Sequence, residues 1–438
     1  MRTVVQKFGG SSLATLDQIR SVADHVARGH RAGHRMVVVV SARGETTDEL
    51  LALAAAVGGA AASGAAASGL AASQERREVD QLLATGECAS AALLALALRG
   101  IGVPAVSLTG AQAGVVATPE HGAGVIEQVC PRRLRRVLAR GSVAVVAGFQ
   151  GIDRAGDIVT LGRGGSDTTA VAMAAALGTG RCEIYTDVAG IFTADPRLVD
   201  RVRVHTGLSS AVTFALASAG ARVLHARCVA LAARHGIDIH VADASSRAGG
   251  TLVRGRPPAG LEQRCVLVGV AHDSDAVRVV VTRPGGRPAE LAAEVLALLA
   301  AHGSAVDMVS AADMVSAGSA FAFTARASAL DDLRGPLREL AGPTSRIVVD
   351  EHLAKVSLVG VGLLDQPRPA ARMLTALRRA GLDPSGLSLS HHRACVTVRR
   401  SRVADAVRAL HDRFENDFTS ESGADALRLP DHERSVAS

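Results

Sequence analysis

An unbroken apolar run, Met36 to Val40, is the feature that most restricts the fold of this chain. A strand without polar alternation is typical of a sheet covered on both faces, as parallel sheets are. Further short strand patterns, each ending in glycines or small polar residues, are predicted at residues 3–7, 105–108, 143–147 and 182–186. Their alternation with helical patterns over about 250 residues predicts an α/β fold with a mostly parallel sheet sandwiched between helices.

A glycine-rich turn at residues 160–170, TLGRGGSDTTA, follows a predicted hairpin and precedes an apolar helix. Its three glycines carry no Cβ, so their backbone N–H groups can approach a ligand closely. A helix beginning at Ser166 or Asp167 would direct its free N–H groups and positive dipole end at the same place. The stretch therefore predicts an anion site, with phosphate as the expected anion.

Lys7 stands at the end of the first predicted strand, immediately before the turn Phe8 to Ser12. It is one of only two lysines in a chain with 48 lysines and arginines, Lys355 being the other. In an open α/β sheet, ligands bind beyond the carboxyl ends of the strands. An ammonium group there would neutralise a phosphoryl group during its transfer. The alternative interpretation is a surface lysine ahead of a turn.

Two nucleotide-binding motifs and the usual metal motifs are missing from the sequence. Neither GxGxxG at the start of a helix nor GxxxxGK[ST] occurs, so neither a Rossmann dinucleotide site nor a P-loop is predicted. The six cysteines show no CxxC spacing and are interpreted as buried thiols. His391 and His392 are interpreted as a polar turn of the chain. No metal-ligating residues are therefore predicted.

The formal net charge of +6 raises the question of nucleic-acid binding. One tyrosine and no tryptophan provide little surface for base stacking, and the basic residues are dispersed, so no nucleic-acid partner is expected. The apolar runs are too short to cross a bilayer, and the N-terminus shows no signal pattern. We therefore expect no membrane association and a cytoplasmic location.

Residues 51–73 are almost entirely alanine, glycine and serine, and this low-complexity insert is predicted to be a mobile surface segment that is partly helical. A helix from about Glu75 to Leu83 is expected to stop at Ala84-Thr85-Gly86. That break places Glu87 at the start of the next helix. A carboxylate at a helix start is usually a partner of the helix dipole. The functional alternative is a carboxylate that holds a substrate ammonium group.

A shift in composition marks a domain boundary near residue 245. We expect a catalytic domain over residues 1–244 and a glycine, proline and arginine-rich linker over 245–263. Beyond it a βαββαβ pattern occurs twice, which predicts one module at 264–350 and another at 351–418. The strand expected at 266–270 is open to pairing with the second module, which would interleave the two. The polar tail, residues 419–438, is predicted to be flexible.

Several sequence motifs resemble those of the aspartokinases, which belong to the amino-acid kinase family and carry paired C-terminal ACT modules. The motifs stand in the family's order: KFGGSS at 7–12, SARGETTD at 41–48, LLATGE at 82–87, TGAQAG at 109–114, VAGFQG at 146–151, TLGRGGSDTTA at 160–170, YTDVAGIFTADPR at 185–197 and GARVLHARCV at 220–229. The resemblance covers nearly the whole chain. It implies that the two C-terminal modules are ACT modules, which bind amino acids in this family.

The resemblance also implies a role for each matched position. Lys7 is expected on the transferring phosphates, with Asp167 beside it to orient the ammonium group. The expected amino-acid ligands are Ser41, Thr47, Glu87 on the α-ammonium group and Arg163 on the α-carboxylate. The expected phosphate-binding backbone comprises Gly9, Gly10, Ser11, Gly164, Gly165 and Ser166. The expected nucleotide-binding residues are Thr186, Asp187, Phe192, Asp195, Arg197 and Arg222.

The implied reaction is phosphorylation of the L-aspartate β-carboxylate by ATP with Mg²⁺, giving 4-phospho-L-aspartate and ADP. A carboxylate is already ionised at neutral pH, so positioning and charge neutralisation would suffice without a general base. The product would serve the aspartate family of amino acids or a specialised pathway. Two alternatives stay open: a kinase of an aspartate analogue, and a catalytically weak regulatory protein that senses an amino acid. ACT modules commonly pair across subunits, so at least a homodimer is expected.

The sequence departs from the family pattern at the nucleotide side and in the modules. Phe192 stands where tyrosine is usual, and Arg222 replaces a lysine. In the first module, the turn that usually carries an asparagine is expected at Ser310 to Ala312. Because that turn usually helps to hold the effector, feedback inhibition by lysine or threonine is left open.

Overall fold

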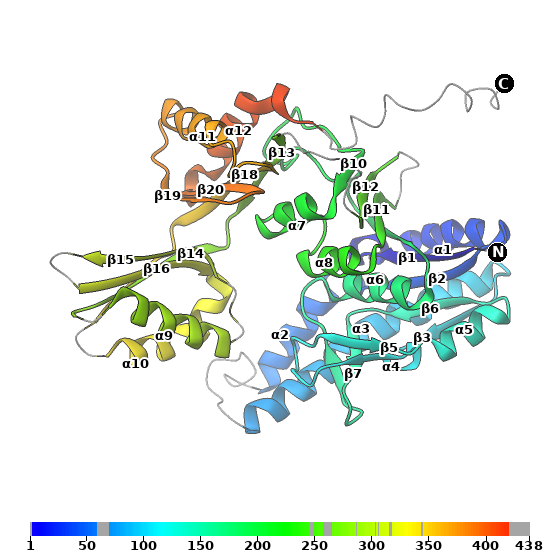
Figure 1. Ribbon diagram of the computed structural model, residues 1–438. Helices are drawn as coiled ribbons and strands as arrows, with labels where there is room; N and C mark the ends of the chain where they lie inside the picture. Colours follow the sequence, from blue (N-terminus) through cyan, green and yellow to red (C-terminus); the bar gives the residue numbers. More distant parts are fainter. Residues whose placement is uncertain are drawn as a thin grey trace.

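The computed structural model of the chain describes residues 2–58, 70–244, 249–256, 265–285, 287–302, 304, 306–314, 318–342 and 345–419. Within these residues, a large α/β domain carries the N-terminal part of the chain, and two smaller α/β modules follow it (Figure 1).

The α/β domain is built on an eight-stranded sheet. In spatial order its strands are β10 (Gly207–Ser209), β12 (Thr251–Arg254), β11 (Asp238–Asp243), β9 (Arg181–Thr186), β1 (Thr3–Phe8), β2 (Arg35–Val40), β6 (Val143–Ala147) and β3 (Ala105–Leu108). All neighbouring pairs are parallel except β11 and β12. The predicted mostly parallel sheet is confirmed.

Helices cover both faces of this sheet. Residues Val37 and Val39 of β2 pack into one hydrophobic core, and Met36, Val38 and Val40 pack into the other. All are buried, which is why the strand shows no polar alternation. On the first face lie α5 (Arg132–Ala139), α6 (Gly165–Leu177), α7 (Ser210–Ser218) and α8 (Ala226–His235). On the second face lie α1 (Leu16–Arg31) and α3 (Leu70–Gly100).

A small second sheet and two further helices lie beside the main sheet. The sheet has the order β5 (Ile126–Val129), β4 (Val115–Ala117), β7 (Gln150–Ile152) and β8 (Ile158–Thr160). Strands β7 and β8 form the predicted hairpin, and the glycine turn begins where β8 ends. The additional helices are α2 (Thr46–Gly58) and the short α4 (Gly110–Ala113). Residues 51–58 of the predicted insert thus belong to α2, while residues 59–69 lie outside the described residues.

Helix α3 corrects one prediction. It runs without a break through Ala84-Thr85-Gly86, so Glu87 lies in the middle of a helix and not at the start of one. A Cβ on Gly86 would lie 3.0 Å from the Cβ of Ala42. The glycine therefore gives clearance for the loop after β2 and does not terminate the helix.

Helix α3 also contains a long apolar stretch. Among the described helices, Gln74–Gly100 has the length and composition that could cross a membrane, and half of that stretch is buried inside the protein. It packs against β3, β6 and β8. In this fold it serves as a core helix.

The C-terminal part forms two four-stranded antiparallel sheets, each with two helices. The first contains β15 (Asp307–Met314), β16 (Gly318–Arg326), β14 (Ala276–Arg283) and β17 (Arg346–Asp350) with α9 (Pro288–Ala301) and α10 (Leu330–Ala341). The second contains β13 (Val266–Asp273), β18 (Leu353–Val361), β20 (Arg393–Arg399) and β19 (Ser385–Leu389) with α11 (Arg368–Arg379) and α12 (Val403–Phe414).

Strand β13 interleaves the two modules. It precedes the first module in the chain, yet it pairs antiparallel with β18 of the second. Helix α7 of the α/β domain contacts both β13 and β18, so the second module lies directly against that domain (Figure 1).

Two segments differ from the predicted boundaries. Residues 251–254, expected in the linker, form β12 of the main sheet, because Thr251 and Val253 alternate inward and are buried there. Ser310 to Ala312, expected as a turn, lie within β15 and pair with β16. The other linker residues, 245–248 and 257–263, and the tail beyond residue 419 lie outside the described residues.

Candidate active site

Lys7 and Asp167 meet at the carboxyl edge of the main sheet. The Nζ atom of Lys7, on β1, lies 2.7 Å from Oδ1 of Asp167, the third residue of α6, and each side chain is 12% exposed. A carboxylate in the first turn of a helix is favoured by the helix dipole. The pair holds the ammonium group in place at the end of β1.

The turn after β1 packs tightly on the loop after β2. A Cβ on Gly10 would lie 2.5 Å from the carbonyl oxygen of Ala42, so only glycine fits there. The amide of Gly44 donates to the carbonyl of Gly10 at 3.0 Å, and the amide of Ser41 donates to the carbonyl of Phe8 at 3.2 Å. The loop that carries Ser41, and the start of α2 after it, are thereby fixed beside the end of β1.

The glycine turn places Arg163 in an exposed position. Gly162 and Gly164 on either side adopt left-handed backbone, with φ of 69° and 70°. Gly164 caps α6, which begins at Gly165, one residue earlier than the predicted start. Within the described part of the chain, Arg163 makes no ion pair or hydrogen bond, so its guanidinium group is available to a ligand. A planar guanidinium fork matches a carboxylate.

Glu87 is a buried carboxylate with one unused oxygen. Its Oε1 accepts the amide of Ala42 at 3.1 Å, while its buried Oε2 has no partner among the described residues. Burial raises the pKa of Glu87 to about 7, although the Ala42 hydrogen bond acts in the opposite direction. A buried carboxylate oxygen without a partner is costly, and a cationic ligand would relieve that cost.

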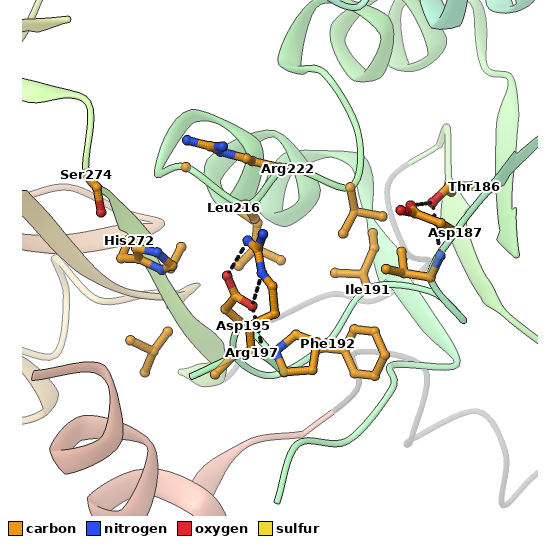
Figure 2. A pocket seen from close by; sticks show the side chains of 18 residues that line it. Thr186, Asp187, Ile191, Phe192, Asp195, Arg197, Leu216, Arg222, His272 and Ser274 are labelled. Atoms are coloured by element: carbon orange, nitrogen blue, oxygen red, sulfur yellow. Dashed lines mark hydrogen bonds and ion pairs between the residues drawn. The ribbon is translucent and has the colours of Figure 1, made fainter. Parts of the chain in front are cut away.

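A pocket of about 550 Å³ opens beside this edge of the sheet (Figure 2). Its size is in the range of small-molecule sites. All six predicted nucleotide-binding residues line it: Thr186, Asp187, Phe192, Asp195, Arg197 and Arg222. The structure therefore brings the whole predicted set together in one cavity.

Hydrogen bonds order the lining of this pocket. The carboxylate of Asp195 accepts two bonds from the guanidinium of Arg197, at 3.0 Å from Nε and 2.7 Å from Nη2 (Figure 2). That contact lowers the pKa of Asp195 below its ordinary value. The hydroxyl of Thr186 donates to Asp187 at 3.1 Å. Asp187 and Arg222 are exposed, and they can meet a charged ligand.

Sequence reasoning missed two polar residues of the pocket, His272 and Ser274. Both come from β13 and the turn after it, beyond the linker. A Cβ on Gly220 would lie 2.1 Å from the carbonyl oxygen of His272, so a glycine at 220 permits the close approach of β13. The glycine of GARVLHARCV was the only local signal of that approach.

The pocket adjoins the Lys7 site through neighbouring strands. Thr186 ends β9, which pairs with β1, and the amide of Gly9 donates to the carbonyl of Tyr185 at 3.2 Å. Lys7 and its partner Asp167 thus lie at the end of β1, Glu87 lies against the loop after β2, and the exposed Arg163 stands four residues before Asp167, with the pocket next to them. Together with the fold, this arrangement defines a small-molecule kinase that carries two C-terminal α/β modules.

Comparisons with known proteins agree with this class. Residues 2–243 match the Amino acid kinase family, and residues 356–414 match an ACT domain. The aspartokinase of Mycolicibacterium smegmatis is 40% identical over 421 residues, which cover 94% of this chain and 96% of that protein. The chain therefore belongs to the aspartokinases of the amino acid kinase family.

Two crystal structures of E. coli aspartokinase III resemble the whole chain. Both are 26% identical to it and cover 95% of this chain and 100% of theirs. The complex with aspartate and ADP, described as the R-state, gives a TM-score of 0.78. The complex with lysine and aspartate, described as the T-state, gives 0.68. The chain is thus more similar overall to the R-state complex.

Proposed function

We propose that the protein transfers the γ-phosphoryl group of ATP to the β-carboxylate of L-aspartate, giving 4-phospho-L-aspartate and ADP. One observation carries this proposal: the Lys7–Asp167 ion pair lies between the turn of Arg163 and the strand that ends in the nucleotide pocket. The aspartokinase relatives and the aspartate and ADP complex of a similar enzyme support the choice of substrate.

The amino acid would be held at its two charged groups. Arg163 would bind the α-carboxylate as a fork, because its guanidinium is exposed and otherwise unpaired in the described structure. Glu87 would accept the α-ammonium group on its unpaired oxygen. The hydroxyl groups of Ser41 and Thr47, on the loop and helix after β2, would add hydrogen bonds. These contacts leave the β-carboxylate free to react.

The phosphoryl transfer needs positioning and charge neutralisation. A β-carboxylate oxygen forms a bond to the γ-phosphorus, the bond from that phosphorus to the bridging oxygen breaks, and ADP leaves with the electron pair. Lys7 would pair with the transferring phosphate oxygens, and the backbone at Gly10, Ser11, Gly164 and Ser166 would donate N–H groups. The amides of Gly9 and Gly165, also expected in this set, already donate to the carbonyls of Tyr185 and Gly162 at 3.2 and 2.9 Å. The nucleotide would occupy the pocket between Thr186 and Arg222.

Magnesium would arrive on the ATP phosphates, since this ion keeps several waters and needs few protein ligands. Of the two carboxylates in the pocket, Asp195 is engaged by Arg197, whereas Asp187 is exposed and accepts one hydroxyl. Asp187 would therefore hold the ion or one of its waters. The ion would neutralise charge on the phosphates.

The reaction can be tested directly. The purified protein is incubated with Mg-ATP, L-aspartate and hydroxylamine, because an acyl phosphate forms a coloured hydroxamate. We expect hydroxamate with L-aspartate and none when the amino acid is omitted. Folded protein that yields no hydroxamate with aspartate or its analogues would support a regulatory protein instead.

We further propose that the modules regulate a cytoplasmic homo-oligomer and respond weakly to amino acids. The lysine complex of a similar enzyme supports a regulatory role. In this chain, the carboxylate of Asp307 at the junction of the modules already pairs with Arg393 at 2.6 Å and with Lys355 at 3.2 Å. A cationic effector would have to displace them. We expect millimolar lysine plus threonine to inhibit little, and strong inhibition would contradict this assignment.

A further inference from the structure

The side chain of Arg163 is held by no hydrogen bond or ion pair in the described residues. The flanking Gly162 and Gly164 are conformationally permissive. An arginine on such a turn would not select a carboxylate unless the turn itself were held. The structure shows two buried or half-buried charged groups that hold it, Asp80 and Arg227, and neither has a role in the reaction derived above.

Asp80, on α3, accepts hydrogen bonds from the start of the Arg163 turn. Its side chain is 1% exposed, and its Oδ2 accepts the amides of Thr160 at 2.9 Å and Gly122 at 3.0 Å. The same oxygen lies 3.0 Å from Nδ1 of His121, and Oδ1 accepts the hydroxyl of Thr160. Every contact is with the end of β8 or with the neighbouring turn. The carboxylate therefore fixes the point at which the Arg163 turn begins.

Arg227 holds the turn from the side of α8. Its Nη1 donates to the carbonyl of Leu161 at 2.6 Å, and its Nη2 donates to the carbonyl of Gly124 at 2.9 Å. The amide of Gly124 in turn donates to the carbonyl of Thr160 at 2.9 Å. Arg227 has no carboxylate partner in the described structure, and burial lowers its pKa. Its planar fork thus bridges two backbone segments and does not neutralise a charge.

The segment that carries Arg227 also reaches the nucleotide pocket. Gly220 and Arg222 line that pocket, and three residues further on His225 packs against Gly164, where a Cβ would lie 2.2 Å from the His225 Cβ. The turn of Arg163 is therefore positioned relative to the nucleotide-binding wall. In the proposed reaction, that relation would set the distance between the phosphoryl donor and its acceptor.

We propose that Asp80 and Arg227 are positioning residues that hold residues 160–164 so that Arg163 binds the α-carboxylate in the reactive geometry. The proposal rests on the proposed function. Misplacing a reacting group by about 1 Å can cost on the order of a hundredfold in rate, so loss of either residue should be visible in turnover.

The first test uses Arg227→Lys, which keeps the charge but loses the fork, with Arg234→Lys on the exposed face of the same helix as its control. We expect kcat/KM for aspartate to fall about tenfold to a hundredfold in Arg227→Lys, with KM for ATP changed less than about twofold. Arg234→Lys should match the wild type. An unchanged kcat/KM for aspartate in Arg227→Lys would overturn the proposal.

A second test does not depend on turnover. Amide hydrogen exchange of peptides covering residues 158–166 is measured in the ligand-free protein. We expect faster exchange there in Arg227→Lys and in Asp80→Asn than in the wild type, with unchanged exchange in β1 and β2. If exchange rises while kcat/KM for aspartate stays normal, the two residues stabilise the turn without positioning Arg163, and the proposal is wrong.

The two tests separate this proposal from the proposed function. A wild type that makes no hydroxamate would end the kinase assignment, yet the exchange measurement would still show whether the two residues hold the turn. If Asp80→Asn fails to fold, as judged by thermal melting, Arg227→Lys decides the outcome. Normal exchange of residues 158–166 in a folded Arg227→Lys would contradict the proposal in either case.

Discussion

The ammonium group of Lys7 lies 2.7 Å from the carboxylate of Asp167, although the two residues come from the first strand of the chain and from a helix after the eighth. The contact is an ion pair between two side chains that are each 12% exposed. Asp167 also lies in the first turn of the helix that follows Arg163. One ion pair thus joins the lysine proposed to bind phosphate to the turn proposed to bind the amino acid.

Replacement of Lys7 tests this relationship. Lys7→Ala removes the positive charge beside the transferring phosphoryl group, and we expect turnover to fall by about 10³-fold or more. The unfolding transition should remain cooperative, because the side chain lies at the edge of the core. Hydroxamate formation and thermal melting measure the two effects. Arg35→Ala, at the exposed start of the adjoining β2, is the control. Activity like that of the wild type in Lys7→Ala would refute the assigned role.

The raised pKa of Glu87 gives a pH dependence with a definite sign. Burial raises this pKa to about 7 in the free protein, so below pH 7 the carboxyl group is mostly protonated and cannot pair with an ammonium group. We expect kcat/KM for aspartate to fall as pH drops below 7, approaching about tenfold per pH unit, because this parameter reports the free enzyme.

A profile between pH 5.5 and 8.5 checks that expectation. Glu87→Gln should have a low kcat/KM for aspartate at every pH and should not show the fall below pH 7. Glu49→Gln, whose side chain is exposed on α2, should show the same fall as the wild type. A wild-type profile that is flat through pH 7 would contradict the role of Glu87 in binding the ammonium group.

The main sheet and the clustering of the expected pocket residues could be predicted because their signals are local. Strand β2 is buried on both faces, and that burial requires the continuous apolar run seen in the sequence. The segments that end at Thr186 and continue through Asp195 to Arg197 bring their pocket residues within one stretch of chain. Most of these pocket residues are close in the sequence and are therefore also close in space.

The errors arose where distant contacts override a local pattern. Gly86 looks like a helix breaker, but α3 continues through it because the helix packs on the main sheet and needs clearance at Ala42. The strand Thr251–Arg254 is hidden in a composition typical of linkers, and its pairing with β11 and β10 establishes it. Apart from Gly220, no local pattern marks His272, which enters the pocket because β13 pairs with β18 and passes against that glycine.

Substitution of Gly164, in the Arg163 turn, can be compared with substitution of Gly178 at the other end of α6. The comparison separates the cost of left-handed backbone from the cost of steric crowding. Gly164 and Gly178 have nearly the same φ, 70° and 68°, but a Cβ on Gly164 would lie 2.2 Å from the His225 Cβ while Gly178 faces open space. Gly178→Ala should cost about 1 kcal/mol of unfolding free energy from the left-handed backbone alone. Gly164→Ala should cost about 3 kcal/mol, because overpacking adds to that strain.

Urea unfolding and aspartate kinetics measure the difference between the two variants. We expect Gly164→Ala also to lower kcat/KM for aspartate, since His225 and the Arg163 turn must separate, whereas Gly178→Ala should keep normal kinetics. Equal stability losses in the two variants would show that the Gly164 contact with His225 is relaxed at no cost.

The junction of the two modules should make stability sensitive to acid. Burial raises the pKa of Asp307, but Arg393 and Lys355 outweigh that effect, so the pKa lies below its ordinary value. A carboxyl group with a depressed pKa in the folded state stabilises the protein above its unfolded pKa, near 4, and loses that contribution as pH falls through the folded value. Asp307→Asn should therefore cost about 2 kcal/mol at pH 7, since it weakens hydrogen bonds to charged groups.

The cost of Asp307→Asn should shrink as the pH is lowered from 4 toward 3, because the wild type then loses the same interaction. Urea unfolding of the wild type and the variant at pH 7, 4 and 3 measures this convergence. Asp383→Asn, exposed in the second module, should remain within about 0.5 kcal/mol of the wild type at each pH. A difference between Asp307→Asn and the wild type that stays constant from pH 7 to pH 3 would mean that Asp307 supports the module junction by its shape and not by its charge.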